Sequence, residues 1–238
     1  MNSPLLDLIV LISGRGSNMT AIHAACQDGR LAARVLAVIA DRPEAGGLQL
    51  ARELKIPAHL VSFHNHPQRA GFEQALAERI LGCAAASPHY LVVLAGFMRI
   101  LGADLVARFQ GRMLNIHPSL LPAYRGLDTH RRALADRVAW HGASVHFVSA
   151  ELDGGPVVAQ VRVPVPEGDT PERLSARVQR AEHTLYWRVL GWIAQNRLSL
   201  EASGPCLDGR MLTKPVQWQL AAADSDADTA GELIDVAS

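Results

Sequence analysis

The sequence predicts an α/β fold built on a doubly wound, mostly parallel sheet. Runs such as Leu5–Ile12 and Tyr90–Ala95 are apolar on both faces, which is typical of strands buried in a parallel sheet. Amphipathic segments of helical length separate these runs, as right-handed crossover connections require. Beyond Gly142 the pattern changes to two strand-like runs with a short connection, which predicts an antiparallel strand near the C-terminal half.

The pattern of the first half of the chain predicts the parallel part of the sheet. Apolar, β-branched runs alternate with segments that repeat apolar residues at helical spacing. The expected strands are Leu5–Ile12, Val35–Ala40, Ala58–Ser62, Tyr90–Ala95 and Met113–His117. The expected helices are one that ends near Gln27, followed by Gly46–Leu54, Arg69–Leu81 and Ala103–Phe109.

The second half departs from this alternation. After a helix over Thr129–Arg137, the strands Ala143–Val148 and Pro156–Val165 are joined by Ser149–Gly155, which is too short for a crossover helix. A long C-terminal helix follows, for which Asp169 or Thr170 could be the N-cap, and Pro171 favours Thr170. Its apolar stripe is Leu174, Val178, Ala181, Leu185 and Val189.

Composition limits the class of protein. A chain of 238 residues fits one domain, expected over residues 1–220, and the poorly apolar segment 221–238 is expected to be a disordered tail. Basic and acidic residues balance at 23 each, which gives no bulk electrostatic case for nucleic acid or a membrane surface. The three separated cysteines form no disulfide or zinc pattern. With no apolar run long enough to span a bilayer and no signal peptide, a cytoplasmic protein is expected.

The segment that carries most information about chemistry is Asn115-Ile116-His117-Pro118. Strand alternation places Asn115 and His117 on the same side, so that a hydrogen-bond donor lies beside a proton-transfer group. Such a pair suits reaction at a carbonyl carbon, and Asp153 downstream offers a carboxylate. The alternative is a buried polar cluster that fixes the turn before Pro118. His146 could face the same edge, although a satisfied core histidine is slightly favoured.

The loop Gly14–Asn18 predicts an anion site. It lies between an apolar strand and a helix, where backbone N–H groups and the helix dipole hold phosphate. Asp41 at the end of the second strand suggests a dinucleotide, but Met19 stands where the third glycine is expected. A phosphate monoester therefore fits better, and a turn without ligand is the alternative.

Further candidates line the expected strand ends or share a helix face. Arg69 and Arg99 could clamp a carboxylate, although exposed arginines are common in such loops. Met98 and Ile100 would form one wall of an apolar slot. Gln179 and Glu182 lie one turn apart on the long helix, where a solvated face is the alternative. His130 and His141 could be surface residues.

Several motifs together identify a known family. They are Ile12–Asn18, Leu94–Leu101, Asn115–Pro122, Gly126–His130, Gly142–Val148 and Asp153–Gly155. In this order they closely resemble the phosphoribosylglycinamide formyltransferases, folate-dependent enzymes of purine biosynthesis, over roughly residues 6 to 210. The resemblance implies a Rossmann-like formyltransferase fold, with residues 1–110 as the phosphate- or nucleotide-binding half and 111–220 as the catalytic and folate-binding half.

The resemblance also implies residue roles. The catalytic residues would be Asn115, His117 and Asp153. Residues that would contact the folate are Arg69, Met98, Arg99, Ile100, Leu101, Asn115, Ser149, Ala150, Glu151, Leu152 and Asp153. Residues that would bind glycinamide ribonucleotide are Gly16, Ser17, Asn18, Gln179, Arg180, Ala181 and Glu182. The segment Phe63–Gln68, which precedes Arg69, departs from the family's pattern.

The implied reaction moves the formyl group of 10-formyltetrahydrofolate to the glycine amine of glycinamide ribonucleotide. Asn115 and protonated His117 would stabilise the oxyanion, His117 would transfer protons, and Asp153 would favour its imidazolium form. The folate is a cosubstrate, and neither a metal nor a nicotinamide is expected. The partners are then small molecules, with no nucleic acid or membrane, and the protein is expected to be a monomer or homodimer.

Three alternatives to this function stay open. Methionyl-tRNA formyltransferase should carry a further tRNA-binding domain and a basic balance of charge. Formyltetrahydrofolate deformylase should carry an extra N-terminal domain. A non-catalytic nucleotide-binding module would tolerate loss of Asn115, His117 or Asp153. We also expect the Leu121–Pro122 bond to be cis, because such bonds mark constrained turns near sites.

Overall fold

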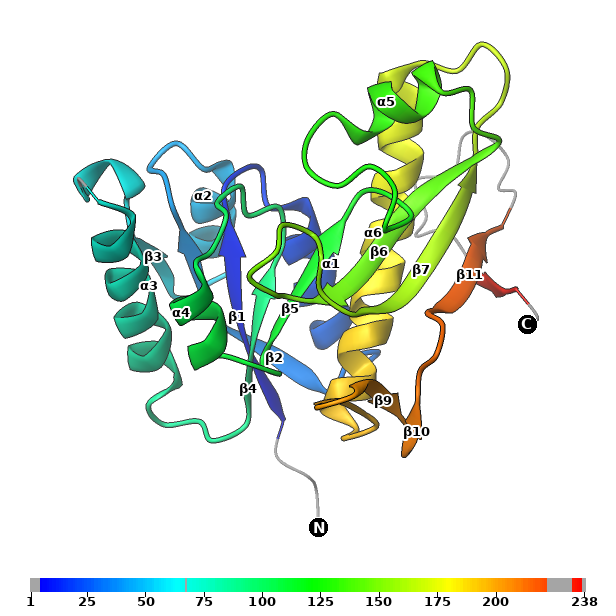
Figure 1. The fold of residues 1–238 in the computed structure, drawn as a ribbon. Helices are drawn as coiled ribbons and strands as arrows, with labels where there is room; N and C mark the ends of the chain where they lie inside the picture. Colours follow the sequence, from blue (N-terminus) through cyan, green and yellow to red (C-terminus); the bar gives the residue numbers. More distant parts are fainter. Residues whose placement is uncertain (1–4, 67, 222–232, 237–238) are drawn as a thin grey trace.

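A central sheet organises the protein, shown as a ribbon in Figure 1. The computed structural model describes residues 5–66, 68–221 and 233–236. Within that part, nine strands hydrogen-bond in the spatial order β12-β11-β7-β6-β5-β4-β1-β2-β3. Their bounds are β1 (Leu6–Ile12), β2 (Ala33–Ala40), β3 (Ala58–Leu60), β4 (Tyr90–Leu94), β5 (Met113–His117), β6 (Trp140–Phe147), β7 (Val157–Pro164), β11 (Val216–Leu220) and β12 (Leu233–Asp235).

The pairing of these strands confirms the predicted fold class. Strands β3, β2, β1, β4 and β5 are mutually parallel, with the chain reversing its direction of travel across the sheet at β1. Strand β6 then pairs antiparallel with both β5 and β7. The sequence pattern predicted this change, because the connection between β6 and β7 is too short for a crossover helix.

Helices cover both faces of the sheet, and the strands divide their side chains between two cores (Figure 1). Successive residues of β1, such as Leu8 and Ile9, point to opposite faces of the sheet and enter different cores. One core contains α1 (Ser17–Gln27), α2 (Gly46–Glu53) and α6 (Pro171–Ala194), and the other contains α3 (Arg69–Ala84) and α4 (Ala103–Arg108). A short helix, α5 (Thr129–Ala135), contacts α6. Among the helices of the described residues, none is both long and apolar enough to span a membrane.

Helix α6 ties the parallel strands to the rest of the domain. Thr170 is its N-cap and accepts a hydrogen bond from Arg173 N at 3.3 Å, with Pro171 in the first turn, as predicted. The buried Tyr186 hydroxyl lies 3.0 and 2.9 Å from the carbonyl oxygens of Leu94 and Leu114. The helix therefore holds the end of β4 and the start of β5, the two strands that lead into the candidate site.

The structure corrects the bounds of some elements and the expectation for the tail. Strand β6 begins at Trp140 rather than Ala143, and α3 extends to Ala84 rather than Leu81. The expectation of a disordered tail is wrong at its end, because residues 233–235 form β12, which pairs antiparallel with β11. Residues 222–232 and 237–238 lie outside the described part, so the expectation is untested there. The physical reason for β12 is its one large apolar contact, since Leu233 is buried in the same core as Trp218 and Leu220.

A small three-stranded sheet follows α6, and the sequence analysis did not predict it. Its strands are β8 (Leu198–Glu201), β9 (Gly204–Leu207) and β10 (Arg210–Met211), all paired antiparallel. Tight turns connect them, with positive φ at Gly204 and Gly209. Leu198 and Leu207 pack this sheet against the core that contains α6.

Candidate active site

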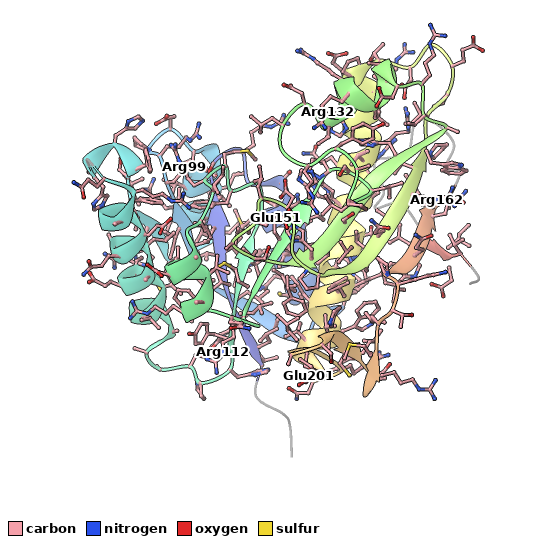
Figure 2. The ribbon with its side chains drawn as sticks, viewed as in Figure 1. Arg99, Arg112, Arg132, Glu151, Arg162 and Glu201 are labelled. Atoms are coloured by element: carbon pink, nitrogen blue, oxygen red, sulfur yellow. The ribbon has the colours of Figure 1, made fainter. Side chains whose placement is uncertain are left out.

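A cavity of about 880 Å³ lies at the carboxyl ends of the parallel strands. The segments that follow β1 and β4 line it together with the end of β5, because parallel strands deliver their carboxyl ends to one edge of a sheet. In Figure 2 Arg99 lies on the α3 side of these strand ends and Arg132 lies on α5, on the opposite side. Residues of α6 complete the lining.

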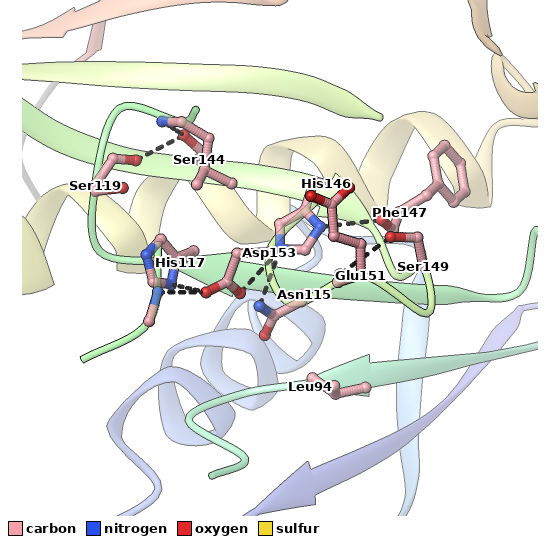
Figure 3. A network of polar contacts seen from close by, with 12 residues as sticks. Leu94, Asn115, His117, Ser119, Ser144, His146, Phe147, Ser149, Glu151 and Asp153 are labelled. Carbon is pink, nitrogen blue, oxygen red and sulfur yellow. Dashed lines mark hydrogen bonds and ion pairs between the residues drawn. The ribbon is translucent and has the colours of Figure 1, made fainter. Parts of the chain in front are cut away.

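His117 is held between a backbone carbonyl and a carboxylate. Its Nε2 lies 2.9 Å from the carbonyl oxygen of Tyr124, which can only accept, so Nε2 carries a hydrogen. Its Nδ1 lies 3.4 Å from Asp153 Oδ2. That oxygen also accepts a hydrogen bond from Gly126 N at 2.9 Å, which orients the carboxylate. Figure 3 shows Asp153 between His117 and Asn115. The arrangement leaves Nδ1 as the nitrogen that can exchange a proton.

Asn115 is oriented by His146, as Figure 3 shows. Asn115 Nδ2 and His146 Nε2 are 3.0 Å apart, and His146 Nδ1 lies 2.9 Å from its neighbour's carbonyl, Phe147 O. The carbonyl requires hydrogen on Nδ1, so Nε2 accepts from the Asn115 amide. Burial lowers the pKa of His146, which favours this neutral form. One hydrogen of the Asn115 amide therefore remains available to a ligand.

His146 shows that the two interpretations of this residue are compatible. It is a buried histidine with both ring nitrogens bonded, as favoured from the sequence. It also touches Asn115 and lies 3.8 Å from Asp153 Oδ1, so it belongs to the site. The β5–β6 register explains the position, because Asn115 pairs directly with His146. The alternation of side chains along the expected strand Ala143–Val148 was the sequence feature that indicated this contact.

A buried polar network fixes the turn that follows His117. Ser144 Oγ donates to Ser119 O at 2.6 Å and accepts from Leu121 N at 3.0 Å (Figure 3). Gln160 Nε2 donates to Ser144 Oγ at 2.9 Å and to Leu121 O at 2.8 Å. The Ser144 hydroxyl thus uses its donor and both acceptor positions. The Leu121–Pro122 bond in this turn is cis, as expected.

The other end of the cavity is lined by the loop that leads into α1, and the start of α2 packs against this loop. Gly16 has φ +83° and directly precedes α1, which has no side-chain cap. A Cβ at Gly16 would lie 2.9 Å from Gly47 Cα, so glycine is needed for the first turn of α2 to pack against this loop. Gly47 N donates to Gly14 O at 3.0 Å. Backbone N–H groups at such N-termini favour an anion, as predicted for this loop.

Two polar pairs connect α1 to α6 beside this loop. Asn18 Nδ2 donates to Glu182 Oε2 at 2.9 Å, and Gln179 Nε2 donates to Ser17 Oγ at 3.0 Å. Burial raises the pKa of Glu182 to about 7, and the Asn18 hydrogen bond opposes that rise. Gln179 and Glu182 thus face the cavity rather than solvent, so the solvated-face alternative for these two residues is wrong.

An apolar rim borders the end of the cavity that holds Asn115 and His117. Met98, Ile100, Leu127 and Leu152 line the cavity and are all exposed, with Leu127 exposed to 75%. Scattered exposed apolar side chains are ordinary, but four around one cavity mouth form a surface for a flat apolar group. Arg99 closes this side. Its Nε donates to Asp41 Oδ2 at 2.5 Å and its guanidinium stacks on the Phe63 ring.

The cavity gathers most of the residues singled out in the sequence. Its lining includes Gly16, Ser17, Asn18, Met98, Arg99, Ile100, Asn115, His117, Leu152, Asp153, Gln179 and Glu182. Outside the lining lie Arg69, Leu101, Ser149, Ala150, Glu151, Arg180 and Ala181. Arg69 pairs with Glu73 at 2.6 Å on α3, Glu151 pairs with Arg125, and Ala181 is buried in the core. Roles for this second group stay predictions.

Some lining residues were not assigned a role from the sequence. They include Arg15, Arg42, Gly126–His130, Ser175 and Val178. The motif Gly126–His130 was visible, whereas Arg42 reaches the cavity through packing that no local pattern indicates. The suggestion that His141 is a surface residue is wrong, because it is 1% exposed. Its ring stacks edge-on against His130 and Tyr124, and burial lowers its pKa to about 4.

The ionisable side chains of the site suit proton transfer, since His117 and Asp153 lie within 3.4 Å of each other. Among the described residues, no group of three or more His, Cys, Asp or Glu side chains could hold a metal ion. Asp41, the acid that suggested a dinucleotide, is buried and shared by Arg99 and Arg42. It is 1% exposed and does not line the cavity, so it is not placed to accept hydrogen bonds from a ribose there.

Comparison with known proteins gives a consistent result. The profile of the formyl transferase family matches residues 6–190. The phosphoribosylglycinamide formyltransferase of Escherichia coli (strain K12) is 44% identical over 207 residues, covering 87% of this chain and 96% of that protein. The enzyme of the same name from Haemophilus influenzae is 38% identical with the same coverage.

Solved structures agree with the sequence relatives. A phosphoribosylglycinamide formyltransferase from Coxiella burnetii superposes with a TM-score of 0.83 at 45% identity, covering 88% of this chain and 96% of that chain. A formyltetrahydrofolate deformylase from Pseudomonas putida KT2440 gives a TM-score of 0.75 at 27% identity. It covers 87% of this chain but 72% of the deformylase chain.

Proposed function

This chain belongs to the formyl transferase family, and we propose that it transfers the formyl group of 10-formyltetrahydrofolate to the glycine amine of glycinamide ribonucleotide in purine biosynthesis. The observation that carries the proposal is the placement of Asn115, His117 and Asp153 in the same cavity as an uncapped helix N-terminus suited to phosphate. One end suits acyl transfer chemistry and the other suits a phosphorylated acceptor.

The acceptor would lie along α1 and α6. Its phosphate would bind the N–H groups of Gly16, Ser17 and Asn18, and its ribose would meet Glu182 and Gln179. Glu182 is buried, so a sugar hydroxyl would give its carboxyl a partner that water does not supply. The glycine amine would then extend toward Asn115 at the end of β5.

The folate would lie against the apolar rim. Met98, Ile100 and Leu152 offer exposed apolar surface to a flat ring system, next to the carboxylate of Asp153. The 10-formyl carbon would then lie between the rim and Asn115. Folate contacts by Arg69 and by Ser149–Glu151 remain part of the proposal, although these residues stand outside the cavity lining.

In the reaction, the substrate amine attacks the formyl carbon and a C–N bond forms as the carbonyl oxygen becomes an oxyanion. The free hydrogen of the Asn115 amide would donate to that oxygen, where negative charge develops. The C–N10 bond then breaks. One proton leaves the amine and one reaches N10, so the step releases no net proton.

His117 would carry out this proton transfer through Nδ1, because Nε2 is committed to the Tyr124 carbonyl. Asp153 faces Nδ1 at 3.4 Å and would stabilise the imidazolium when the ring takes up a proton. The hydrogen bond that Gly126 N donates to Asp153 would keep the carboxylate in place through the cycle.

A steady-state assay tests the proposal. Formyl transfer is measured with glycinamide ribonucleotide and 10-formyltetrahydrofolate, and free formate replaces the folate as the control donor. We expect turnover with the folate only, and a loss of about a hundredfold or more in kcat for His117→Ala. Unchanged turnover in His117→Ala would refute the mechanism. Folate hydrolysis that does not need the ribonucleotide would favour a deformylase instead.

A further inference from the structure

We propose that Arg15 and Arg42 form a cationic clamp on the phosphate monoester of the acceptor substrate, in addition to the backbone N–H groups of the Gly14–Asn18 loop. The inference rests on the proposed function and deepens it. Two arginine side chains would recognise the charged phosphate. They would therefore make the protein prefer a nucleotide to the corresponding nucleoside.

The first support is position. Arg15 and Arg42 both line the cavity, at the end that contains the Gly14–Asn18 loop. Arg42 begins the turn into α2, since Ala45 N donates to Arg42 O at 3.3 Å. That turn ends against the loop, because a Cβ built on Gly46 would lie 3.9 Å from Arg15 Cα. The two arginine-bearing segments are therefore neighbours.

The second support is the backbone between the two arginines. Helices α1 and α2 both begin here, and neither has a side-chain cap. The close approach of Gly16 to Gly47 brings their N-termini together at one place. Next to them, the Asn18 side chain is buried in the cavity lining and its Oδ1 has no hydrogen-bond partner. The N–H groups at the start of α1, beside this unpaired amide oxygen, suit a phosphate attached to a hydroxylated sugar.

The third support is unbalanced charge. Within the described residues, Arg15 is exposed and has no ion-pair or hydrogen-bond partner. Arg42 has an ion-pair contact of 3.6 Å with Asp41 Oδ1, and its Nε is buried without a hydrogen bond. Asp41 also binds Arg99 through its other oxygen at 2.5 Å. One carboxylate thus faces two guanidinium groups, which leaves positive charge for a ligand.

The chemistry of the clamp matches a phosphate monoester. Such a group carries about −1.5 to −2 charge at neutral pH and three acceptor oxygens, and guanidinium groups bind it through paired hydrogen bonds. The chain as a whole has a formal net charge of zero, so attraction for the anion must come from a local group such as this one.

Titration calorimetry with ribose 5-phosphate tests the clamp without any formyl transfer. We expect Arg15→Ala and Arg42→Ala each to weaken binding about tenfold. The matched control is Arg52→Ala, which removes the same charge from the exposed C-terminal end of α2. Arg15 has no partner in the described structure, so Arg15→Ala should fold normally. Affinities within twofold of wild type in both variants, or an equal loss in Arg52→Ala, would overturn the clamp.

Kinetics then separate the phosphate from other anions of the substrates. We expect kcat/KM for glycinamide ribonucleotide to fall about tenfold in Arg15→Ala, with little change for the dephosphorylated nucleoside. A selective rise in the folate KM would overturn the proposal, because the arginines would then bind the folate's carboxylates. If ribose 5-phosphate binding depends on Arg15 but no formyl transfer occurs, the proposed function fails and the clamp stands.

Discussion

At the scale of single residues, the hydrogen-bond partners of His117 and His146 determine what each ring can do. Both rings contact a backbone carbonyl, but through different nitrogens, His117 through Nε2 and His146 through Nδ1. The remaining nitrogen of His117 therefore faces Asp153, and that of His146 accepts from Asn115. Two histidines lie a few ångströms from one carboxylate, and in the proposed mechanism His117 transfers protons while His146 orients Asn115.

Asp153→Asn tests the role of the carboxylate at this scale. The amide oxygen can still accept from Gly126 N, so the loop should keep its conformation, but the negative charge that supports the His117 imidazolium is lost. We expect kcat to fall about a hundredfold with little change in either KM. Steady-state kinetics and the unfolding midpoint measure the two effects. A variant with wild-type kcat would contradict the role of Asp153.

The buried carboxyl of Glu182 makes the free energy of unfolding depend on pH. Burial raises its pKa to about 7 from an ordinary value of 4.5, so the folded state holds a proton that the unfolded state releases. Its contribution is therefore most favourable below pH 4.5 and is lost progressively as pH rises to about 7. Glu182→Gln keeps an acceptor for Asn18 and removes this titration. Relative to wild type, the variant should gain up to about 3 kcal/mol between pH 5 and pH 8.

Urea unfolding at pH 5 and pH 8 measures that gain. Other groups titrate in the same range, but they do so in both proteins and cancel in the difference between variant and wild type. If the stability difference between Glu182→Gln and wild type were the same at both pH values, Glu182 would not titrate as described.

At the scale of elements, the contact between the starts of α1 and α2 shapes the anion site. Gly16→Ala would put a Cβ 2.9 Å from Gly47 Cα and would strain a backbone with φ +83°. We expect a loss of about 1–3 kcal/mol and weaker ribonucleotide binding, with folate affinity retained. Gly14→Ala in the same loop is the control, because a Cβ there meets nothing within 4 Å. Similar losses from both substitutions would show that the helix contact is unimportant.

Strand β12 gives a second prediction for an element. Leu233 is buried against the core, whereas its neighbour Ile234 is 55% exposed. Leu233→Ala should therefore cost about 2 kcal/mol in the free energy of unfolding, and Ile234→Ala should cost almost nothing. Chemical denaturation of both variants measures the contrast. Two near-zero changes would mean that β12 does not dock on β11.

The elements also show which features a sequence can predict. Helix α6 was predictable because its cap, proline and apolar stripe are local signals. Strands β11 and β12 were missed because they are short and contribute few buried side chains, so only pairing with distant strands defines them. The site was predictable at Asn115 and His117, where strand alternation acts. The position of Arg42 was not predictable from a local pattern, because Arg42 reaches the cavity through the packing of the turn into α2.

At the scale of the whole molecule, the sheet brings separate segments together. The loop after β1, the segment after β4 and the end of β5 reach one edge because these strands are parallel and adjacent. The return through the antiparallel β6 and β7 then supplies Asp153 from the connection between them. The division into a phosphate half and a catalytic half remains a prediction, and so does a monomeric or homodimeric state.

The most direct test of the central claim follows the transferred carbon. The purified protein is mixed with glycinamide ribonucleotide and 10-formyltetrahydrofolate carrying carbon-13 in the formyl group, and the label is followed by NMR. Direct attack by the amine predicts that the label appears in the formamide of the ribonucleotide product, with no free labelled formate, and that His117→Ala slows its appearance about a hundredfold or more. Labelled formate that accumulates at the same rate with and without the ribonucleotide would contradict formyl transfer.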